Sequence, residues 1–409
     1  MIIKLAWRNL WRQKRRTILT AGSVALTLAL SLFMRAMQEG VYTQNIDNSA
    51  RFYTGYLQLQ HPDYQDSSSI DDVISGHHEF VSALNQISDI SHIIPRIESY
   101  ALAAYGERSK GVMILGIAPD EEAAYSEINQ RISAGQYFSA TAQGVLIGEG
   151  VAQHFNLNVG DELILYGQGY QGQTAAGVYP VLGIVKFPIK EIDRQLVYLP
   201  LRQAQELFGL GQQVTSWVLH THDIYTLPII QEWLQQQYAD QAVVRSWREM
   251  SPEMAQQIDL DRVSGIFLMY ILYGIVGFGV FATLIMMVLE RQREFAVMIA
   301  TGLERRKLLA LVMIESFFMS MFGIVCGLAV ALPIIFWFVF HPISLSGEYA
   351  EMMLELGWEP VLPVLLTPRL LIEQVAMVLL IVCLCLGYPL WRVWRLNVVA
   401  AIKGGAHAD

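Results

Sequence analysis

Two long hydrophobic runs flank a short charged stretch in the second half of the chain. Residues 263–289 contain no charged side chain over 27 positions, and residues 308–340 contain one, Glu315, over 33 positions. A helix of about 20 apolar residues crosses the hydrocarbon core of a bilayer. Both runs are therefore predicted to be transmembrane helices, which excludes a purely soluble fold.

The stretch between them, residues 290–307, carries both kinds of charge at high density. Its basic residues are Arg291, Arg293, Arg305, Arg306 and Lys307, and its acidic residues are Glu290, Glu294 and Glu304. Because short loops rich in Lys and Arg stay in the cytoplasm, we predict a cytoplasmic elbow here. Its apolar middle, residues 295–300, is predicted to form a short amphipathic helix that ends at Thr301-Gly302. The pattern alone also fits a plain connecting loop.

The amino terminus combines a basic segment with a third hydrophobic run. Residues 1–17 hold six Lys or Arg and no acid, and tryptophans recur on one helical face. This pattern predicts an interfacial helix on anionic lipid. Its predicted anchors are Trp7, Arg8, Trp11, Arg15 and Arg16. Residues 17–34, 18 uncharged positions, predict the first membrane helix, and a cleaved signal peptide is the alternative.

A fourth span is predicted over about residues 370–391. Arg392 and Arg395 follow it and favour a cytoplasmic carboxyl terminus. Four spans then place both termini in the cytoplasm and residues 39–262 on the opposite side. The loop over residues 341–369, with four prolines and four acids, is expected on that outer side as well.

The charge balance supports an exported domain. Residues 38–262 hold 27 Asp or Glu against 12 Lys or Arg, whereas basic residues gather at the predicted membrane edges. Because the basic residues lie at the membrane edges and form no broad basic face, the charge pattern disfavours nucleic-acid binding. The three cysteines, Cys326, Cys383 and Cys385, all lie in hydrophobic runs. They are interpreted as small apolar residues, and no disulfide framework is predicted for the domain.

The exported domain is predicted to be α+β, with mixed order of elements. Strands are expected at residues 56–60, 112–117, 145–147, 162–166, 179–185, 195–199, 217–220 and 242–245. Helices are expected at residues 79–87, 151–155, 201–208 and 229–238. We expect two lobes, one from the middle of the segment and one from its flanks.

Three motifs in this domain suggest ligand chemistry, and each has a simpler interpretation. Residues 167–174 have the spacing of a phosphate-binding loop, but Gln173 stands where the Lys is required and no helix pattern follows. A flexible turn is therefore favoured. His220 and His222 would place two imidazoles on one strand face, as a metal site needs, but no partner cluster is evident and a surface strand end is favoured. The run at 167–172 also matches the Gly-x-Gly-x-x-Gly spacing, a weak signal that fails for the same reasons as the phosphate-binding loop. The histidine pair at residues 77–78 is a weaker metal signal still.

One segment of the elbow, REFAVMIATGLERRKLLALVMIES, resembles the cytoplasmic signature of FtsX-like ABC transporter permeases, the family of MacB, FtsX and the LolC and LolE subunits. The pattern is an Arg-Glu pair, an apolar stretch, a Gly, two basic residues and a helix with an early Glu. In that family this loop is the coupling helix that docks on the ATPase subunit. The residues that the resemblance assigns to ATPase coupling are Arg293, Glu294, Phe295, Met298, Gly302, Arg305 and Arg306.

Further segments carry the resemblance along nearly the whole chain. LAWRNLWRQKRRTILTAGSVALTLAL resembles the family's opening helix. GVLIGEGVAQHFNLNVGDELILYG resembles the periplasmic core domain of MacB-like permeases, and IDRQLVYLPLRQAQELFG matches a later element of that domain. Residues 389–396 resemble the family's closing motif. The implied fold is an α-helical membrane protein with four transmembrane helices and a large α+β extracytoplasmic domain between the first two.

The resemblance implies a non-catalytic membrane subunit without a fused ATPase domain and with no cofactor or metal of its own. The expected partners are two copies of an ABC ATPase subunit, which bind ATP and Mg²⁺, a second permease copy or paralogue, and membrane lipids. A periplasmic adaptor or chaperone is a further candidate partner. Gly323 and Gly327 form a small-xxx-small step assigned to helix packing or dimer contact. Glu315, an acid inside a predicted membrane helix, is a candidate functional residue on that ground alone. A structural or coupling role is favoured over a proton relay, and capping or pairing with Arg305 or Lys307 is the alternative.

The implied setting is the bacterial inner membrane, with the large domain in the periplasm or outside the cell. The domain boundaries are 1–38, 39–262 and 263–409, the last with a coupling loop at 290–307. The implied function is ATP-driven movement of the exported domain that releases or exports lipoproteins or other amphiphilic cargo. Two alternatives are an FtsX-type signalling permease that activates a cell-wall hydrolase, and a membrane-anchored sensor without an ATPase.

Overall fold

The structure, a computed structural model, divides by its contacts into two compact units. The first comprises residues 1–42, 258–344 and 361–409, and the second comprises residues 43–257 and 345–360. The described residues are 8, 12, 14–64, 69–187, 190–239, 241–355 and 360–403.

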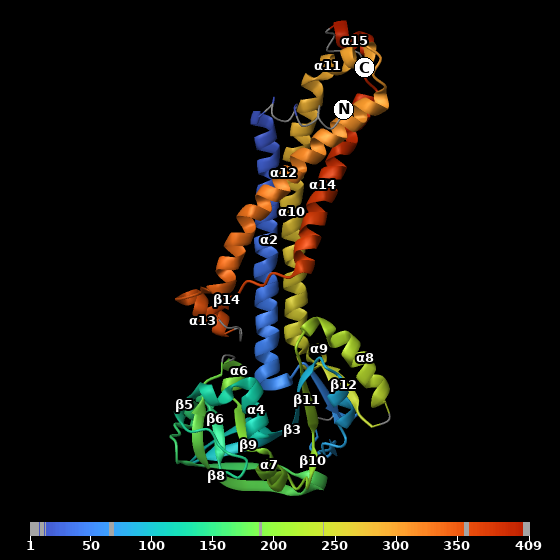
Figure 1. The fold of residues 1–409 in the computed structure, drawn as a ribbon. Helices are drawn as coiled ribbons and strands as arrows, with labels where there is room; N and C mark the ends of the chain where they lie inside the picture. The colour runs from blue at the N-terminus through green and yellow to red at the C-terminus, as the bar shows by residue number, and fades with distance from the viewer. Residues whose placement is uncertain are drawn as a thin grey trace. The chain divides into compact units, whose positions relative to one another are not determined.

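Four long helices supply most of the first unit (Figure 1). They are α2 (Lys14–Ser49), α10 (Pro252–Glu290), α12 (Arg305–Phe340) and α14 (Pro368–Trp394). All four are long and apolar enough to cross a membrane, which confirms the predicted four spans. Only 28–39% of each apolar window is buried within the chain. Most of this apolar surface therefore needs lipid or a partner to cover it.

The helix α10 begins at Pro252, well before the predicted start at residue 263. The residues between are polar but include good helix formers such as Glu, Met, Ala and Gln, so the backbone stays helical outside the apolar run. A proline at the first turn costs little, because its missing N–H would be unpaired there anyway. Hydropathy thus marks the apolar part of the helix and not its end.

Two buried apolar clusters hold the helices of the first unit together. One contains Val24, Leu28, Leu284, Phe295, Leu311, Val382 and Val393, among others. The second contains Leu32, Ala36, Ala331, Ile335, Val364 and Leu370. Each cluster draws on α2, α12 and α14, so the packing connects helices that are far apart in the sequence.

A ten-stranded mixed sheet forms the second unit. In sheet order its strands are β12 (Val243–Ser246), β1 (Leu57–Gln60), β11 (Ser216–Thr221), β3 (Ile90–Tyr105), β4 (Arg108–Ile117), β9 (Leu196–Pro200), β6 (Val145–Gly148), β8 (Thr174–Val185) and β5 (Ile132–Gly135). The tenth, β7 (Glu162–Gln168), pairs with both β3 and β8. The pairs β4–β9 and β6–β8 are parallel.

Short helices pack against this sheet. They are α4 (Pro119–Ser126), α5 (Glu149–Phe155), α6 (Lys190–Asp193), α7 (Leu201–Phe208), α8 (Leu227–Gln237) and α9 (Trp247–Met250). The chain enters the sheet through η1 (Ala50–Thr54), a π-helical turn that follows α2 directly. In the loop between α12 and α14 lie β13 (Ile343–Ser344), α13 (Glu348–Glu355) and β14 (Val361–Leu362).

All eight predicted strands are confirmed, but the longest strand was not predicted. Strand β3 contains Pro95, which lacks the N–H that a ladder needs, and its second half is rich in Ala, which has low strand propensity. The helix predicted at 79–87 is wrong, since only a 3-10 turn, η2 (Ser82–Gln86), forms there. As predicted, strands from the two flanks of the domain lie next to one another, and so do strands from its middle. The two sets are not separate lobes, however, because β3 and β4 join them into one continuous sheet.

Candidate functional site

The elbow contains a short helix, α11 (Gln292–Ala300), as the apolar pattern predicts. Gly302 follows it with φ of 101°, a backbone conformation that glycine adopts without steric cost. Phe295 is fully buried beneath the helix, while Val297 is 52% exposed. Arg293 and Thr301 are also exposed and, at a spacing of four residues, share a face with Val297. We call this outward face, formed by Arg293, Val297 and Thr301, the docking face.

A chain of ion pairs backs the elbow. Arg12 Nη2 lies 3.0 Å from Glu294 Oε1, and Glu294 Oε2 lies 3.1 Å from Arg291 Nε. Arg291 Nη1 in turn lies 2.7 Å from Glu315 Oε2. The chain of ion pairs thereby links the amino-terminal segment, α11 and the third turn of α12.

The last of these pairs is buried, since Arg291 is 7% exposed and Glu315 is 2% exposed. The guanidinium of Arg291 also lies 5.1 Å from the centroid of the Phe295 ring. Charges this deeply buried are tolerated only when they are paired and hydrogen-bonded. The alternative in which Glu315 pairs with Arg305 or Lys307 is therefore wrong, because loop packing brings Arg291 to Glu315 instead.

Arg305 and Lys307 have other contacts. Arg305 Nη1 donates to the carbonyl oxygen of Trp394, the last residue of α14, and its Nη2 donates to that of Leu396, two residues further on, at 3.0 Å. Unpaired carbonyls at a helix end accept such donors well. Lys307 pairs with Glu304 at 2.9 Å on the surface. The short helix that follows, α15 (Val398–Lys403), packs against α11 (Figure 1).

The residues expected to couple to an ATPase thus differ in their accessibility. Arg293 and Arg306 are exposed, and Met298 is half-buried against the apolar cluster. The side chain of Phe295 is not accessible, so it supports α11 from within. Val297 was not among the predicted residues, although its position four residues after Arg293 is a readable signal.

The two glycines of α12 lie against α2 of the same chain. A Cβ added to Gly323 would lie 2.7 Å from the Ala21 carbonyl oxygen, and one added to Gly327 would lie 2.9 Å from that of Ala25. Cβ atoms do not approach other atoms this closely without a shift, so the absence of a side chain permits the helix contact.

Part of the predicted lipid anchor lies outside the described residues. This applies to Trp7 and Trp11 and to the side chain of Arg16. Arg8 and Arg15 are described and exposed, as an interfacial cation requires.

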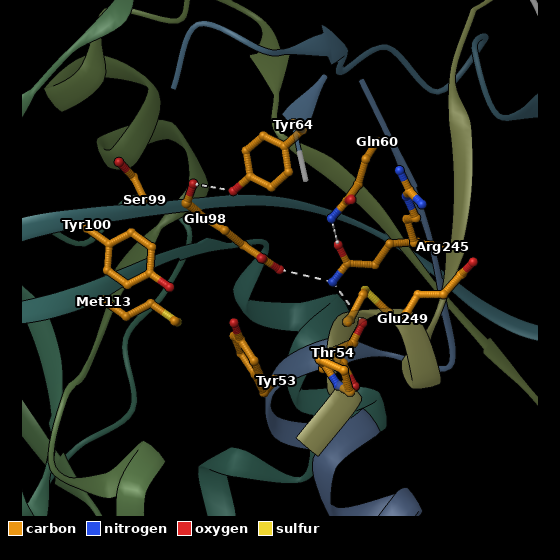
Figure 2. A pocket seen from close by; sticks show the side chains of 13 residues that line it. Tyr53, Thr54, Gln60, Tyr64, Glu98, Ser99, Tyr100, Met113, Arg245 and Glu249 are labelled. Carbon is orange, nitrogen blue, oxygen red and sulfur yellow. Dashed lines mark hydrogen bonds between the residues drawn. The ribbon is translucent and has the colours of Figure 1, made fainter. Parts of the chain in front are cut away.

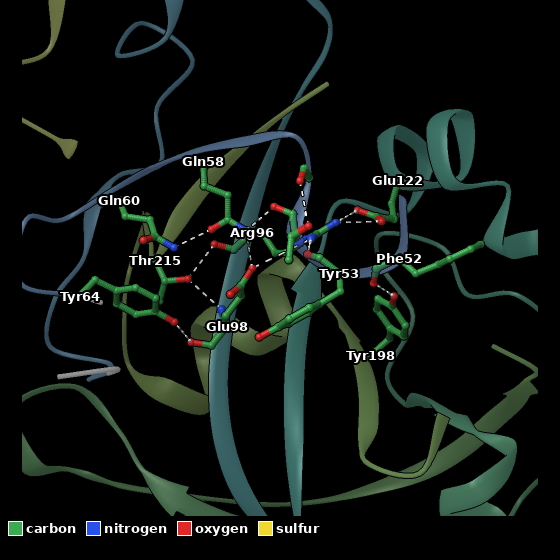
Figure 3. Close-up of polar contacts among 12 residues, drawn as sticks. Phe52, Tyr53, Gln58, Gln60, Tyr64, Arg96, Glu98, Glu122, Tyr198 and Thr215 are labelled. Atoms are coloured by element: carbon green, nitrogen blue, oxygen red, sulfur yellow. Dashed lines mark hydrogen bonds and ion pairs between the residues drawn. The ribbon is translucent and has the colours of Figure 1, made fainter. Parts of the chain in front are cut away.

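At the entry to the sheet, three buried side chains hold the carbonyl oxygens of η1 (Figure 3). Arg96 donates to Tyr53 O, Tyr198 donates to Phe52 O at 3.0 Å, and Gln58 donates to Thr54 O at 2.8 Å. Carbonyls at a helix end have no intrahelical partners, so side-chain donors from the sheet fix the end in place. We call this group the η1 clamp.

Arg96 is the central residue of the clamp and is completely buried. Its Nη2 contacts both carboxylate oxygens of Glu122 at 3.0 Å, a two-point pair that neutralises the guanidinium. Its position in β3, the unpredicted strand, explains why the pairing was not anticipated.

The motifs weighed for ligand chemistry do not form ligand sites. The residues at 167–174 form the turn between β7 and β8, as expected. His220, expected at a surface, is instead fully buried, stacks on Tyr125 at 3.4 Å between ring centroids and pairs across strands with His92. Burial lowers the pKa of His220 well below its usual range. Within the described ranges, only His61, Asp63 and Asp72 have ligand atoms at metal-binding spacing.

Family models match both halves of this architecture. The MacB-like periplasmic core domain matches residues 17–237, and the FtsX-like permease C-terminal model matches residues 266–398. The chain belongs to the family of FtsX-like permeases with a MacB-like periplasmic core domain. The match to the MacB-like periplasmic core domain alone covers more than half of the residues of this permease.

Curated relatives of this permease include three kinds of transporter subunit. It is 24% identical over 321 residues to the lipoprotein-releasing system transmembrane protein LolC of Neisseria meningitidis, covering 75% of this chain and 73% of the relative. It is 26% identical to LolE of Haemophilus influenzae, covering 54% of each chain. It is 21% identical to the macrolide export ATP-binding/permease protein MacB of Nitrosomonas europaea, covering 82% of this chain and 52% of the relative.

Among solved structures, the periplasmic region of MacB from Actinobacillus actinomycetemcomitans covers 50% of this chain and 92% of its own, at 14% identity and a TM-score of 0.34. The extracellular domain of the transporter YknZ covers 47% of this chain at 12% identity and a TM-score of 0.33.

Proposed function

We propose that this permease transmits movement from partner ATPase subunits to its large domain, and that this movement releases lipoproteins from the membrane. The observation that carries the proposal is the elbow. Its docking face presents Arg293, Val297 and Thr301 outward, while the buried pair of Arg291 and Glu315 holds the inner side. An exposed face of mixed apolar and basic character suits a protein partner, and a fixed backing is needed to pass displacement on.

The path of the movement follows continuous helices. The division between the two units falls within α2 and α10, so each helix contributes residues to both. Displacement of a hydrogen-bonded helix is transmitted along its axis, as in rigid-body switching. In the large domain, the η1 clamp ties the end of α2 to the sheet. ATP and Mg²⁺ would be bound by the partner subunits.

Lipoprotein cargo is favoured over small-molecule export on one ground. The similarity to LolC of Neisseria meningitidis covers 73% of that relative, whereas the similarity to MacB covers 52% of a longer relative. We accordingly propose an inner-membrane complex of two permease subunits and two ATPase subunits, with the large domain in the periplasm and both termini in the cytoplasm.

The coupling proposal is tested by co-purification. The tagged chain is co-expressed with the ABC ATPase subunit of its own organism and purified in detergent, and ATP hydrolysis is measured. Arg293→Glu combined with Val297→Asp should abolish both retention of the ATPase and hydrolysis. Arg202→Glu, a charge reversal at an exposed site on α7, should change neither. If the wild-type chain retains no ATPase, the coupling proposal is wrong.

The cargo proposal is tested by depletion in cells. Retention of lipoproteins in the inner membrane would support it. Normal lipoprotein sorting together with a division defect would reject it in favour of an FtsX-type signalling permease. Cells that carry only the variant with Arg293→Glu and Val297→Asp should show the same phenotype as depleted cells, whereas cells that carry Arg202→Glu should not.

A further inference from the structure

A cavity of about 260 Å³ lies in the second unit beside the η1 clamp (Figure 2). Its walls come from η1, β1, β3, β12 and α9. They include three phenols, two amides, a guanidinium and two carboxylates, which belong to Glu98 and Glu249. Ligand sites usually measure about 300 Å³ or more, so this cavity suits a small polar group.

The Glu98 carboxylate has few hydrogen-bond donors in the wall. Its Oε1 accepts one hydrogen bond, from Gln58 Nε2 at 3.1 Å, and Arg96 Nη1 lies 4.0 Å away. Arg96 is already neutralised by Glu122 at 3.0 Å. In the described part of the chain no other donor reaches this carboxylate. A carboxylate has about four acceptor positions, so a cationic donor from outside would complete its hydrogen bonding.

Burial raises the pKa of the Glu98 carboxyl, and the nearby Arg96 opposes that shift. The direction is the one expected of a carboxylate short of donors in a low-dielectric wall. A bound cation would remove this cost.

Aromatic rings surround the same carboxylate. Tyr53 and Tyr100 lie beside Glu98 in Figure 2, and Tyr64 donates its hydroxyl to the Glu98 backbone carbonyl at 2.9 Å. The faces of phenol rings attract ammonium groups. Tyr100 is 58% exposed and lies at the mouth, so it would meet the ligand first.

A guanidinium occupies the opposite part of the wall. Arg245 of β12 pairs across strands with Gln58 of β1, the residue that donates to Glu98. Paired residues project from the same face of a sheet. Among the described residues, no carboxylate lies within 4.0 Å of the Arg245 guanidinium nitrogens. The second carboxylate of the wall, Glu249, accepts hydrogen bonds from Ser246 and Gln231 instead. Arg245 is therefore available to an anionic group on the ligand.

We propose that this cavity binds a small zwitterion, with its ammonium group against Glu98 and the phenols and its anionic group against Arg245. Ethanolamine phosphate has this chemistry. The group would come either from a phosphatidylethanolamine head group or from a free soluble zwitterion. This site does not depend on the ATPase or cargo proposals.

Calorimetric titration of the full chain in detergent tests the site. Ethanolamine phosphate should bind saturably. Glycerol phosphate, which lacks the ammonium, and ethanolamine, which lacks the anion, should each bind about tenfold more weakly or worse, since each loses a charge-assisted contact. Glu98→Gln and Arg245→Gln should each weaken ethanolamine phosphate binding by a similar factor. Glu206→Gln, at an exposed site on α7, should bind as the wild type does.

Tyr100→Leu provides a second test that stays valid if the Glu98 variant fails to fold. Tyr100 is exposed, so its substitution should leave the fold intact. The Tyr100→Leu variant should weaken binding several-fold. The proposal is overturned if ethanolamine phosphate shows no saturable binding up to about 10 mM, or if Tyr100→Leu and Arg245→Gln both bind it normally.

Nanodiscs distinguish the two sources of the zwitterion. The chain is placed in discs of phosphatidylglycerol alone or of phosphatidylglycerol with phosphatidylethanolamine. Weaker binding of the soluble probe in the mixed discs means that the lipid head group competes for the cavity. Equal binding in both discs assigns the cavity to a soluble zwitterion.

Discussion

The guanidinium of Arg291 lies 2.7 Å from a carboxylate oxygen of Glu315, and both side chains are almost completely buried. The pair joins the loop before α11 to the interior of α12. Its geometry fixes the inner side of the elbow, so that the docking face on the other side of α11 has a rigid support.

Breaking this pair from one side should be strongly destabilising. Glu315→Gln removes the buried partner of Arg291, which keeps only the half-exposed Glu294 at 3.1 Å. Loss of one partner of a buried pair costs about 3–5 kcal/mol, and the remaining pair with Glu294 places the expected loss near the lower figure. The double variant Arg291→Met with Glu315→Leu should recover most of that loss, because no unpaired charge remains. Thermal unfolding of the full chain in detergent measures both. Glu304→Gln, in an exposed pair with Lys307, should stay within about 0.5 kcal/mol of the wild type. Additive effects in the double variant would contradict the pairing.

Removing Arg96 should loosen the entry to the sheet. Arg96→Met leaves Glu122 buried without its partner and frees the Tyr53 carbonyl. Hydrogen exchange of backbone amides in residues 50–60 of the full chain should accelerate about tenfold or more, because local opening becomes easier. Arg202→Met, which breaks an exposed pair with Glu206, should leave that exchange unchanged. Protection equal to the wild type would show that the clamp is not needed.

Substitution of glycine by alanine should change stability differently at two positions in the membrane helices. Gly323→Ala places a Cβ 2.7 Å from the Ala21 carbonyl oxygen, so α12 and α2 must move apart. Gly274→Ala meets nothing within 4 Å and should be neutral or stabilising by up to about 1 kcal/mol. Thermal unfolding in detergent should rank the variants in that order. A Gly323→Ala protein as stable as Gly274→Ala would refute the close contact.

Acid should weaken the large domain partly through His220. Burial lowers the pKa of His220 in the folded state, whereas an unfolded histidine titrates near about 6.5. The unfolded state therefore binds the proton first, and stability is lost as the pH falls below about 6.5, by up to about 1.4 kcal/mol per pH unit. Above that pH this histidine contributes no pH dependence.

The variant His220→Phe should lose stability less steeply than the wild type between about pH 6.5 and pH 5, because it has no imidazole to charge. His154→Phe, at an exposed position, should follow the wild-type slope. Thermal unfolding of the full chain across this pH range gives both slopes. Identical slopes for His220→Phe and the wild type would mean that His220 charges freely in the folded state.

Features set by neighbouring residues were predicted correctly from the sequence, whereas features set by contacts between distant segments were not. The helix over residues 295–300 and its end at Gly302 could be predicted, because helical periodicity and the backbone conformation of a glycine depend only on residues a few positions apart. Strand β3 could not be predicted from its own residues, because Pro95 disfavours a strand there. Its pairing with β11 and β4 stabilises the strand in spite of the proline. The burial of Phe295 and of His220 was missed for the same reason, since neighbours from other elements cover both.

The sequence by itself determined four apolar helices, a charged elbow with its own short helix, and a large acidic domain inserted after the first helix. These follow from the length, period and charge of contiguous segments, which each segment carries regardless of its surroundings. Only the tertiary structure decided that Glu315 pairs with Arg291, that Arg96 holds η1, and that Glu98 and Arg245 line one cavity. Those partners are far apart in the chain, and packing of whole elements brings them within reach.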